Sequence, residues 1–306
     1  MKRAKSGGCR PASATEKKAR IKKVLLPYML ITPFLAAFIL FFLYPAGYSL
    51  YLSFFKYKGY GEAKFVGIDN YVSLLNYRVF WKSMGNTLFY FLVHFIPVMG
   101  GAFLFAIAMH SKLMEKAQKI IKPILFLPQI VPVVATSLIF RILFATKSGA
   151  INQLFGTEIR WLEDSSIIRW PVIALIVWRS IGWFMVIFLA GLTTISDDLY
   201  EAATLDGASG WQKIVYITIP LMKSIFMFAF ITDAISSFKI YTEPNIVTAG
   251  SGAAPVDAQP VMNIITNNIK GGNFGSAAAA GWILFVIIFI VSLAQLYFMR
   301  DKEGKR

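Results

Sequence analysis

The sequence predicts an all-α membrane protein that crosses the bilayer about six times. Hydrophobic residues make up 57% of the 306 residues and charged residues only 15%, whereas a soluble domain carries about 25% charged residues. Six apolar runs come close to the length of a transmembrane helix, which needs about 20 residues. Lys and Arg residues gather between these runs and at their ends, where the residues that set membrane topology belong.

Composition divides the chain into three parts. Residues 1–23 hold nine Lys and Arg against one acidic residue, which is typical of a solvated cytoplasmic arm. Residues 24–299 form the transmembrane domain, and residues 300–306 form a charged cytoplasmic tail. Within the domain, the expected spans are residues 24–55, 83–111, 123–140, 170–195, 221–241 and 277–299.

The segments between the spans differ in composition. Residues 56–82 predict an external loop with some helix, and residues 112–122 predict a short basic connection. Residues 142–169 are mixed in character. Residues 243–275 are rich in Gly, Pro, Asn and Ala, which predicts a loop with one short helix.

The distribution of basic residues predicts the orientation. With the termini inside, the inner segments hold 19 Lys and Arg and the outer segments hold 11. Because basic residues are retained on the cytoplasmic side, we expect a multi-pass protein of the cytoplasmic membrane with both termini inside. The net charge of +15 then reflects topology and contact with lipid, and we expect no nucleic-acid partner.

Residues 196–220 form a polar stretch between two apolar runs, and they predict two short helices around a tight turn. Asp206-Gly207 supplies the chemistry of the turn. Pro220 is expected to end or kink the second helix. The pairs expected to cap the two helices are Asp198 with Glu201 and Ser209 with Gln212.

Motifs for catalysis and metal binding do not occur in the sequence. There is no P-loop, no His-Glu-x-x-His zinc motif and no Gly-x-Ser-x-Gly elbow. Cys9 is the only cysteine, so no paired-Cys metal site can form. We therefore expect a protein that is not an enzyme, with no catalytic residue, no metal and no cofactor of its own. If it moves a solute uphill, the energy comes from a partner or from an ion gradient.

The polar stretch resembles the EAA loop of binding-protein-dependent ABC transporter permeases. The family pattern is Glu-Ala-Ala, three residues, Gly, nine residues, then Ile-x-Leu-Pro. It is matched by Glu201-Ala202-Ala203, Gly207, Ile217 and Pro220, with Ile219 in place of Leu, and its longer form is matched by Asp206-Gly207-Ala208-Ser209-Gly210-Trp211. Two positions depart from the pattern, Ile214 where Phe is usual and Ser224 where a second Pro is common. Ordered matches elsewhere, such as Phe126-Leu127-Pro128 and Trp178-Arg179, most resemble the maltose-type first permease.

This resemblance implies an ABC importer permease (MetI-like) fold and a set of partners. The partners would be a second homologous permease, expected as a heterodimer, two ATPase subunits that carry ATP and Mg, and an extracytoplasmic binding protein. The loop would dock on the ATPase through Glu201, Ala202, Ala203, Asp206, Gly207, Ala208, Trp211, Ile217 and Pro220. The alternative is that Glu201 and its neighbours merely start a helix on the membrane surface.

Ionisable and polar residues inside spans are candidates for the substrate pathway. These are Arg179, Trp183, Asp233, Ser236, Ser237 and Tyr241. They would either form a polar cavity that binds a sugar, or Arg179 and Asp233 would pair with each other or with other residues to fix the packing of the helices. Both interpretations stay open at this point.

The expected function is import of a mono-, di- or oligosaccharide, driven by ATP hydrolysis on separate subunits. A permease for glycerol phosphate or another polyol is one alternative. An ion-coupled secondary transporter, with Arg179 and Asp233 as the coupling pair, is the alternative from another class. The sequence does not name the solute.

Overall fold

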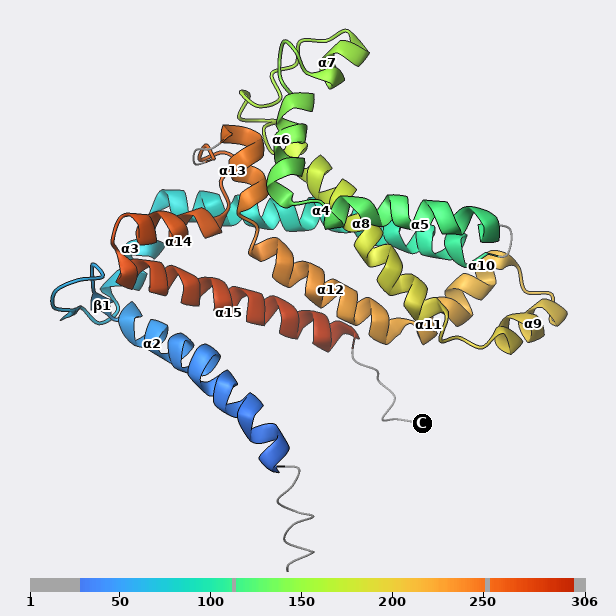
Figure 1. Ribbon diagram of the computed structural model, residues 1–306, viewed down its shortest axis with the longest axis horizontal. Coiled ribbons are helices and arrows are strands. Elements are labelled where there is room, and N and C mark those ends of the chain that lie inside the picture. Colours follow the sequence, from blue (N-terminus) through green and yellow to red (C-terminus); the bar gives the residue numbers. More distant parts are fainter. Residues whose placement is uncertain (1–27, 112–113, 251–253, 300–306) are drawn as a thin grey trace, which may run out of the picture. The chain divides into compact units, whose positions relative to one another are not determined.

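The computed structural model describes residues 28–111, 114–250 and 254–299, and these are mostly helical (Figure 1). The predicted basic arm, residues 1–23, and the predicted tail, residues 300–306, lie outside the described residues. Two compact units divide the chain, Met1–Leu52 and Ser53–Arg306.

The first unit contains one apolar helix, which starts at Tyr28 and runs to Ser53, just past the boundary of the unit. It includes the π-helical turn η1 (Ile39–Leu43), which continues into α2 (Tyr44–Ser53). The Tyr44 N–H donates to the Ile39 carbonyl, five residues back. Pro45 follows directly, and its ring would clash with the carbonyl four residues earlier in a regular α-helix. The wider turn makes room for it, so this proline does not end the span.

The second unit contains three further straight spans and two bent ones. The straight spans are α4 (Arg78–His110), α8 (Trp170–Leu192) and α15 (Phe274–Met299). The bent ones are α5 (Glu115–Ile130) with α6 (Val133–Leu143), at 96°, and residues 210–221 with α12 (Lys223–Phe238), at 70°. By length and composition these elements supply up to six spans with the first helix, and they confirm the predicted fold class.

The third span differs from its predicted boundaries. Residues 112–122 were expected to be a connection, yet α5 already begins at Glu115. The apolar run from residue 123 to 140 is also not one straight helix, because it breaks between Ile130 and Val133. Val131 is extended (φ −67°, ψ 135°), which is the conformation that a following proline favours. The number of apolar residues in a run gives the length of a span but does not show whether the span is straight. The prediction therefore missed this break.

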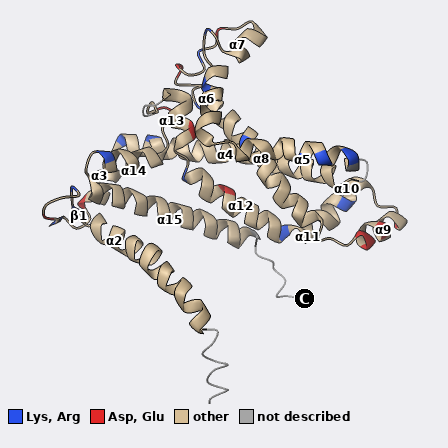
Figure 2. Cartoon of the chain, in the orientation of Figure 1, with Lys and Arg blue, Asp and Glu red and all other residues tan. Residues whose placement is uncertain are grey.

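Buried residues of α4, α8 and α12 form the largest core cluster. A second cluster joins α4, α12 and α15 with the shorter helix α14 (Val261–Lys270), and α12 and α15 run side by side (Figure 1). The cores are mostly apolar, and Lys, Arg, Asp and Glu lie mainly near the helix ends and in the connections (Figure 2). This distribution matches the composition that predicted a membrane protein.

Short elements occupy the connections. Strands β1 (Phe55–Lys56) and β2 (Lys64–Phe65) pair antiparallel, with Phe55 opposite Phe65. The remaining helices of these connections are α3 (Asp69–Leu75), α7 (Ala150–Phe155) and α13 (Thr242–Ala249). Residues 243–275 were expected to contain one short helix, but they contain α14 and nearly all of α13. The Asn and Gly residues of this segment are typical of loops, so the sequence did not predict two helices here.

Candidate functional sites

The polar stretch folds as predicted into two helices around a turn, α9 (Asp197–Leu205) and α10 (Gly210–Lys213). The predicted cap of the first helix was wrong. Ser196 is the N-cap, and its side chain accepts a hydrogen bond from the Asp198 N–H at 3.3 Å. Asp198 already lies inside the first turn with Asp197, where both carboxylates face the positive end of the helix dipole.

The turn after α9 is a Schellman motif. The Ala208 N–H donates to the Ala203 carbonyl at 2.8 Å, and the Gly207 N–H donates to the Thr204 carbonyl at 3.1 Å. Gly207 has φ +78°, a left-handed conformation that glycine adopts without a steric cost. The motif therefore explains why glycine occupies this position of the predicted loop.

The predicted capping box of the second helix is confirmed. The Ser209 N–H donates to Gln212 Oε1 at 2.7 Å, and the Gln212 N–H donates to Ser209 Oγ at 3.3 Å. The helix continues through the π-turn η3 (Ile214–Thr218) and α11 (Ile219–Leu221). It ends one residue after Pro220, where the chain bends by 70° into α12.

Most of the nine predicted docking residues are accessible. Glu201, Ala202, Asp206, Gly207, Trp211 and Pro220 are exposed, and Ala203, Ala208 and Ile217 are half-buried. Two large side chains that were not predicted, Leu205 and Tyr216, are also highly exposed, Leu205 at 90%. The sequence pattern gave no signal for their exposure, because apolar residues in a short helix are as often buried.

Two hydrogen bonds join the helices of the loop. The Lys213 ammonium donates to Thr204 Oγ1 at 2.7 Å, and the hydroxyls of Tyr200 and Thr218 lie 2.9 Å apart. The loop is therefore one folded element that presents an exposed surface and leads directly into α12.

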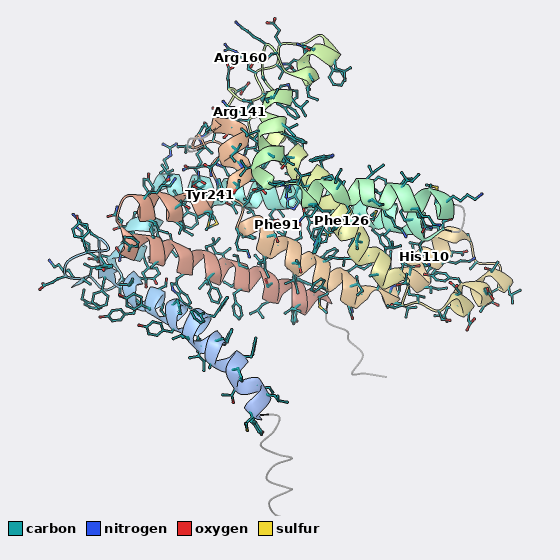
Figure 3. The ribbon with its side chains drawn as sticks, in the orientation of Figure 1. Phe91, His110, Phe126, Arg141, Arg160 and Tyr241 are labelled. Atoms are coloured by element: carbon teal, nitrogen blue, oxygen red, sulfur yellow. The ribbon has the colours of Figure 1, made fainter. Side chains whose placement is uncertain are left out.

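A second candidate site is a cavity of about 300 Å³ among α4, α5, α6, α8, α12 and the α12–α13 segment. All six residues that the sequence predicted for a substrate pathway line this one cavity. Its wall consists of Tyr90, His94, Gln129, Val133, Ile176, Arg179, Ser180, Trp183, Phe184, Thr232, Asp233, Ser236, Ser237, Lys239, Ile240, Tyr241, Thr242 and Glu243. Figure 3 shows Tyr241 near the junction of α12 and α13.

Arg179 and Asp233 do not form an ion pair with each other in the part of the chain that the structure describes. The Nη1 group of Arg179 instead donates to the Val131 carbonyl at 3.0 Å and to Thr136 Oγ1 at 2.8 Å. Val131 lies at the break between α5 and α6 and has no continuing helix to supply a donor. Arg179 therefore stabilises the bent span while it lines the cavity.

Asp233 contacts a residue that the pathway prediction did not include. His94 on α4 places its Nε2 atom 3.1 Å from Asp233 Oδ1, and both side chains are almost fully buried. The partner could not be found from spacing, because 139 residues separate the two.

The cavity wall also carries two charged residues that the pathway prediction did not include, Lys239 and Glu243. Burial raises the pKa of the Glu243 carboxyl, and the positive charge of Arg179 partly opposes this shift. The wall also includes Trp183, which is 40% exposed and whose ring stacks on that of Phe126 with centroids 6.1 Å apart. The cavity therefore combines an aromatic face with polar and charged groups.

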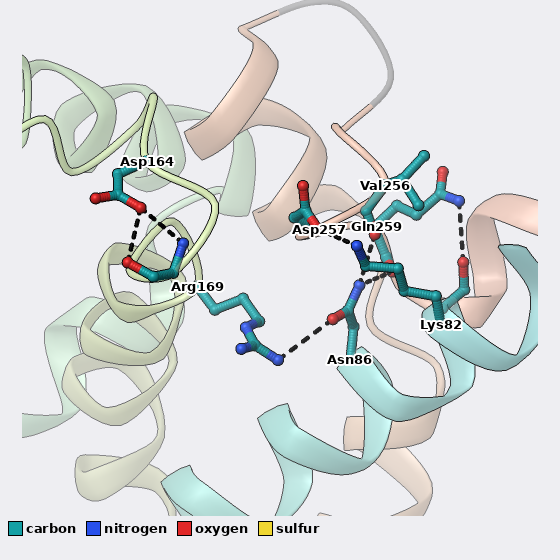
Figure 4. A network of polar contacts seen from close by, with 9 residues as sticks. Lys82, Asn86, Asp164, Arg169, Val256, Asp257 and Gln259 are labelled. Atoms are coloured by element: carbon teal, nitrogen blue, oxygen red, sulfur yellow. Dashed lines mark hydrogen bonds and ion pairs between the residues drawn. The ribbon is translucent and has the colours of Figure 1, made fainter.

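Residues 254–260, which we call the strap, attach near the N-terminal end of α4 (Figure 4). The Asn86 amide donates to the carbonyls of Val256 and Gln259 at 2.9 and 3.0 Å. The Tyr90 hydroxyl, from the cavity wall, donates to the Ala258 carbonyl at 2.7 Å. Lys82 pairs with Asp257, and its hydrogen bond holds the pKa of the Asp257 carboxyl below the usual range. The strap, which leads into α14, is thus held against the cavity wall through Tyr90.

Comparison with known proteins identifies the family. The profile of the family described as "Binding-protein-dependent transport system inner membrane component" matches residues 102–303. The chain is 30% identical over 278 residues to the arabinooligosaccharides transport system permease protein AraP of Halalkalibacterium halodurans, covering 89% of this chain and 87% of the relative. It is 29% identical over 285 residues to the lactose transport system permease protein LacF of Rhizobium radiobacter, covering 90% and 94%.

A solved structure shares the fold. It is a bacterial alginate ABC transporter in complex with an alginate pentasaccharide-bound periplasmic protein, and one of its chains aligns with a TM-score of 0.78 at 23% identity. The alignment covers 92% of this chain and 96% of the other. The family match, the full-length relatives and the shared fold agree with the membrane helices and the polar loop described above. The chain belongs to the inner membrane permease components of binding-protein-dependent ABC transport systems.

Proposed function

We propose that this chain is a permease subunit of a sugar importer and that the cavity among α4, α8 and α12 forms part of the solute pathway. The observation that supports this most is the gathering of six polar and aromatic residues, from two spans and their ends, in one cavity. The relatives named above transport arabinooligosaccharides and lactose.

The composition of the cavity wall suits a sugar. The exposed face of Trp183 offers an apolar surface for the C–H face of a sugar ring, and hydroxyls such as that of Ser236 can bond to its O–H groups. A volume of about 300 Å³ lies at the lower end of small-molecule sites. A short saccharide, or one part of a longer chain, is the solute that fits.

The polar loop is the element that we propose to dock on the ATPase subunits, which would carry ATP and Mg. Leu205 and Trp211 stand 90% and 72% exposed on a folded loop, as expected of apolar groups that bury against a partner. A second permease would complete the pathway, and a binding protein would deliver the solute from outside. Both termini and the loop would lie in the cytoplasm.

The ion-coupled alternative loses its main support. It required Arg179 and Asp233 to act as a coupling pair, but each contacts other residues. An ATP-driven importer remains the function that the site supports best.

Reconstitution tests this proposal. The chain is expressed with its companion permease, ATPase and binding protein, and the complex is placed in proteoliposomes. Radiolabelled lactose and arabinotriose are offered with and without ATP, together with glycerol 3-phosphate. We expect ATP-dependent uptake of at least one sugar. Uptake that continues without ATP, or uptake of glycerol 3-phosphate alone, contradicts the proposal.

A matched pair of variants tests the role of the loop. Leu205→Asp places a charge on the proposed docking surface, and Leu154→Asp places one on α7, where the leucine is similarly exposed (77%). We expect the ATPase to co-purify with the second variant and to be lost from the first. Equal recovery of the ATPase with both variants contradicts the assignment of the loop.

A further inference from the structure

The charged groups of the cavity do not cancel, and this imbalance bears on the kind of sugar that it accepts. This inference rests on the proposed function. Four charged side chains line the cavity, Arg179 and Lys239 as cations and Asp233 and Glu243 as acids, together with His94. Whether the wall is neutral depends on how the His94–Asp233 pair holds its protons.

Hydrogen-bond geometry fixes the protons of His94. Its Nδ1 atom lies 2.6 Å from the Tyr90 carbonyl oxygen, and a carbonyl can only accept, so Nδ1 carries a hydrogen. Its Nε2 atom faces Asp233 Oδ1 at 3.1 Å and Ser237 Oγ at 3.3 Å. The Ser237 hydroxyl donates its own hydrogen to the Asp233 backbone carbonyl at 2.7 Å, so it offers Nε2 only a lone pair.

One further proton must therefore lie between Nε2 and Oδ1. Without it, the lone pair of Nε2 would face a carboxylate oxygen in a buried site, where unpaired polar groups cost the most. The proton can belong formally to the imidazole or to the carboxyl group. In both cases the two side chains together carry no net charge, so Asp233 does not offset a cation elsewhere in the cavity.

Lys239 is the cation whose charge no acidic residue of the cavity offsets. It follows α12 as the C-cap residue, its side chain is exposed at the cavity, and the described residues include no ion-pair partner for it. Arg179 and Glu243 line the same cavity and carry opposite charges, so they offset each other.

We propose that the cavity selects sugars that carry a carboxylate and that Lys239 is the residue that recognises this group. A single negative charge matches the one unpaired ammonium, whereas a phosphate ester carries about −1.5 to −2 at neutral pH. An ammonium–carboxylate hydrogen bond is stronger than one to a neutral hydroxyl. The solute class is therefore a uronate or a short saccharide with a uronate residue.

Paired sugars test this proposal in the reconstituted complex. Galactose and galacturonate differ only in whether C6 is a hydroxymethyl or a carboxylate group, and digalacturonate extends the comparison to a disaccharide. Uptake per ATP hydrolysed is measured for wild type, Lys239→Gln and Lys239→Arg. Because the same binding protein serves every variant, a change in preference between variants belongs to the permease.

We expect Lys239→Gln to lower the preference for galacturonate over galactose by about 10- to 100-fold, the loss typical of one charged hydrogen bond. Lys239→Arg should retain most of the preference. Lys270→Gln, on the exposed part of α14, is the control and should leave the preference unchanged. Co-purification of the ATPase shows that each variant has folded and assembled.

Two results overturn the proposal. One is an unchanged preference in Lys239→Gln, and the other is faster uptake of galactose 6-phosphate than of galacturonate. ATP-driven uptake of galactose alone would also overturn it while leaving the proposed sugar importer intact. Absence of uptake of every sugar would instead contradict the proposed function itself.

Discussion

Gly182 allows a close contact between α8 and the backbone of α5. A Cβ atom at this position would overlap the backbone carbonyl of Leu125 on α5 and lie 2.9 Å from the Phe126 nitrogen. Because the obstacle is backbone, no side chain can turn away to relieve it. In Gly182→Ala, α8 and α5 must move apart until these contacts exceed the 3.0 Å that real Cβ atoms keep.

The expected cost follows from this geometry. Overpacking a core costs about 1–3 kcal/mol, and contact with rigid backbone places this variant near the upper end. A loss of about 3 kcal/mol lowers the melting temperature by about 6–12 °C in a domain of this size. Because α8 carries Arg179 and Val131 directly follows α5, the shift also weakens the hydrogen bond between them that stabilises the bent span.

Thermal unfolding of the purified complex in detergent measures the effect, with sugar uptake as a second readout. The matched control is Gly100→Ala in α4, where an added Cβ meets no atom within 4 Å. We expect the control to melt at or above the wild-type temperature, since alanine favours a helix by about 1 kcal/mol over glycine. If Gly182→Ala melts together with the control, the close contact between α5 and α8 is wrong.

Three further predictions concern the loop, the bent span and the strap. In Gly207→Ala the added Cβ meets no atom within 4 Å, but the alanine must adopt a left-handed conformation, which costs about 1–2 kcal/mol. Hydrogen exchange of the amides in the turn should therefore accelerate about 5- to 30-fold. The control variant Gly210→Ala should show no such acceleration. Arg179→Leu leaves the half-buried Val131 carbonyl without its charged donor, so the melting temperature should fall by an amount equivalent to about 1–3 kcal/mol. An unchanged melting temperature refutes the structural role of Arg179. Asn86→Ala removes two hydrogen bonds from the strap, so amide exchange in residues 254–260 should rise while exchange in α8 stays constant.

The sequence was sufficient for the fold class and the polar loop because their signals are local. Charge-free runs have the length that a helix needs to cross a bilayer. The capping box of Ser209 and Gln212 lies within four residues of the sequence. The turn at Gly207 likewise depends on neighbours in the chain. Such features require no knowledge of which helices meet.

The cavity shows where local signals end. Asp233 and Arg179 were recognisable as unusual residues for a span, but their partners depend on tertiary packing. Asp233 meets His94, and Arg179 caps a break whose existence depends on the Val131-Pro132 bend. Glu243 was assigned to a loop because the short helix α13, which brings it to the wall, has no clear apolar period.

The bend at Met222 joins the two candidate sites mechanically. The helix of residues 210–221 leads into α12 without an intervening loop, and Met222 itself is 1% exposed, packed in the core. Asp233 lies about 16 Å along α12 from this pivot, at 1.5 Å per residue. A tilt of α12 by about 5° would carry Asp233 about 1.4 Å at that lever length. That displacement is enough to break its contact with His94 at 3.1 Å, so even a small tilt of α12, which continues directly from the polar loop, would change the charge balance at the cavity.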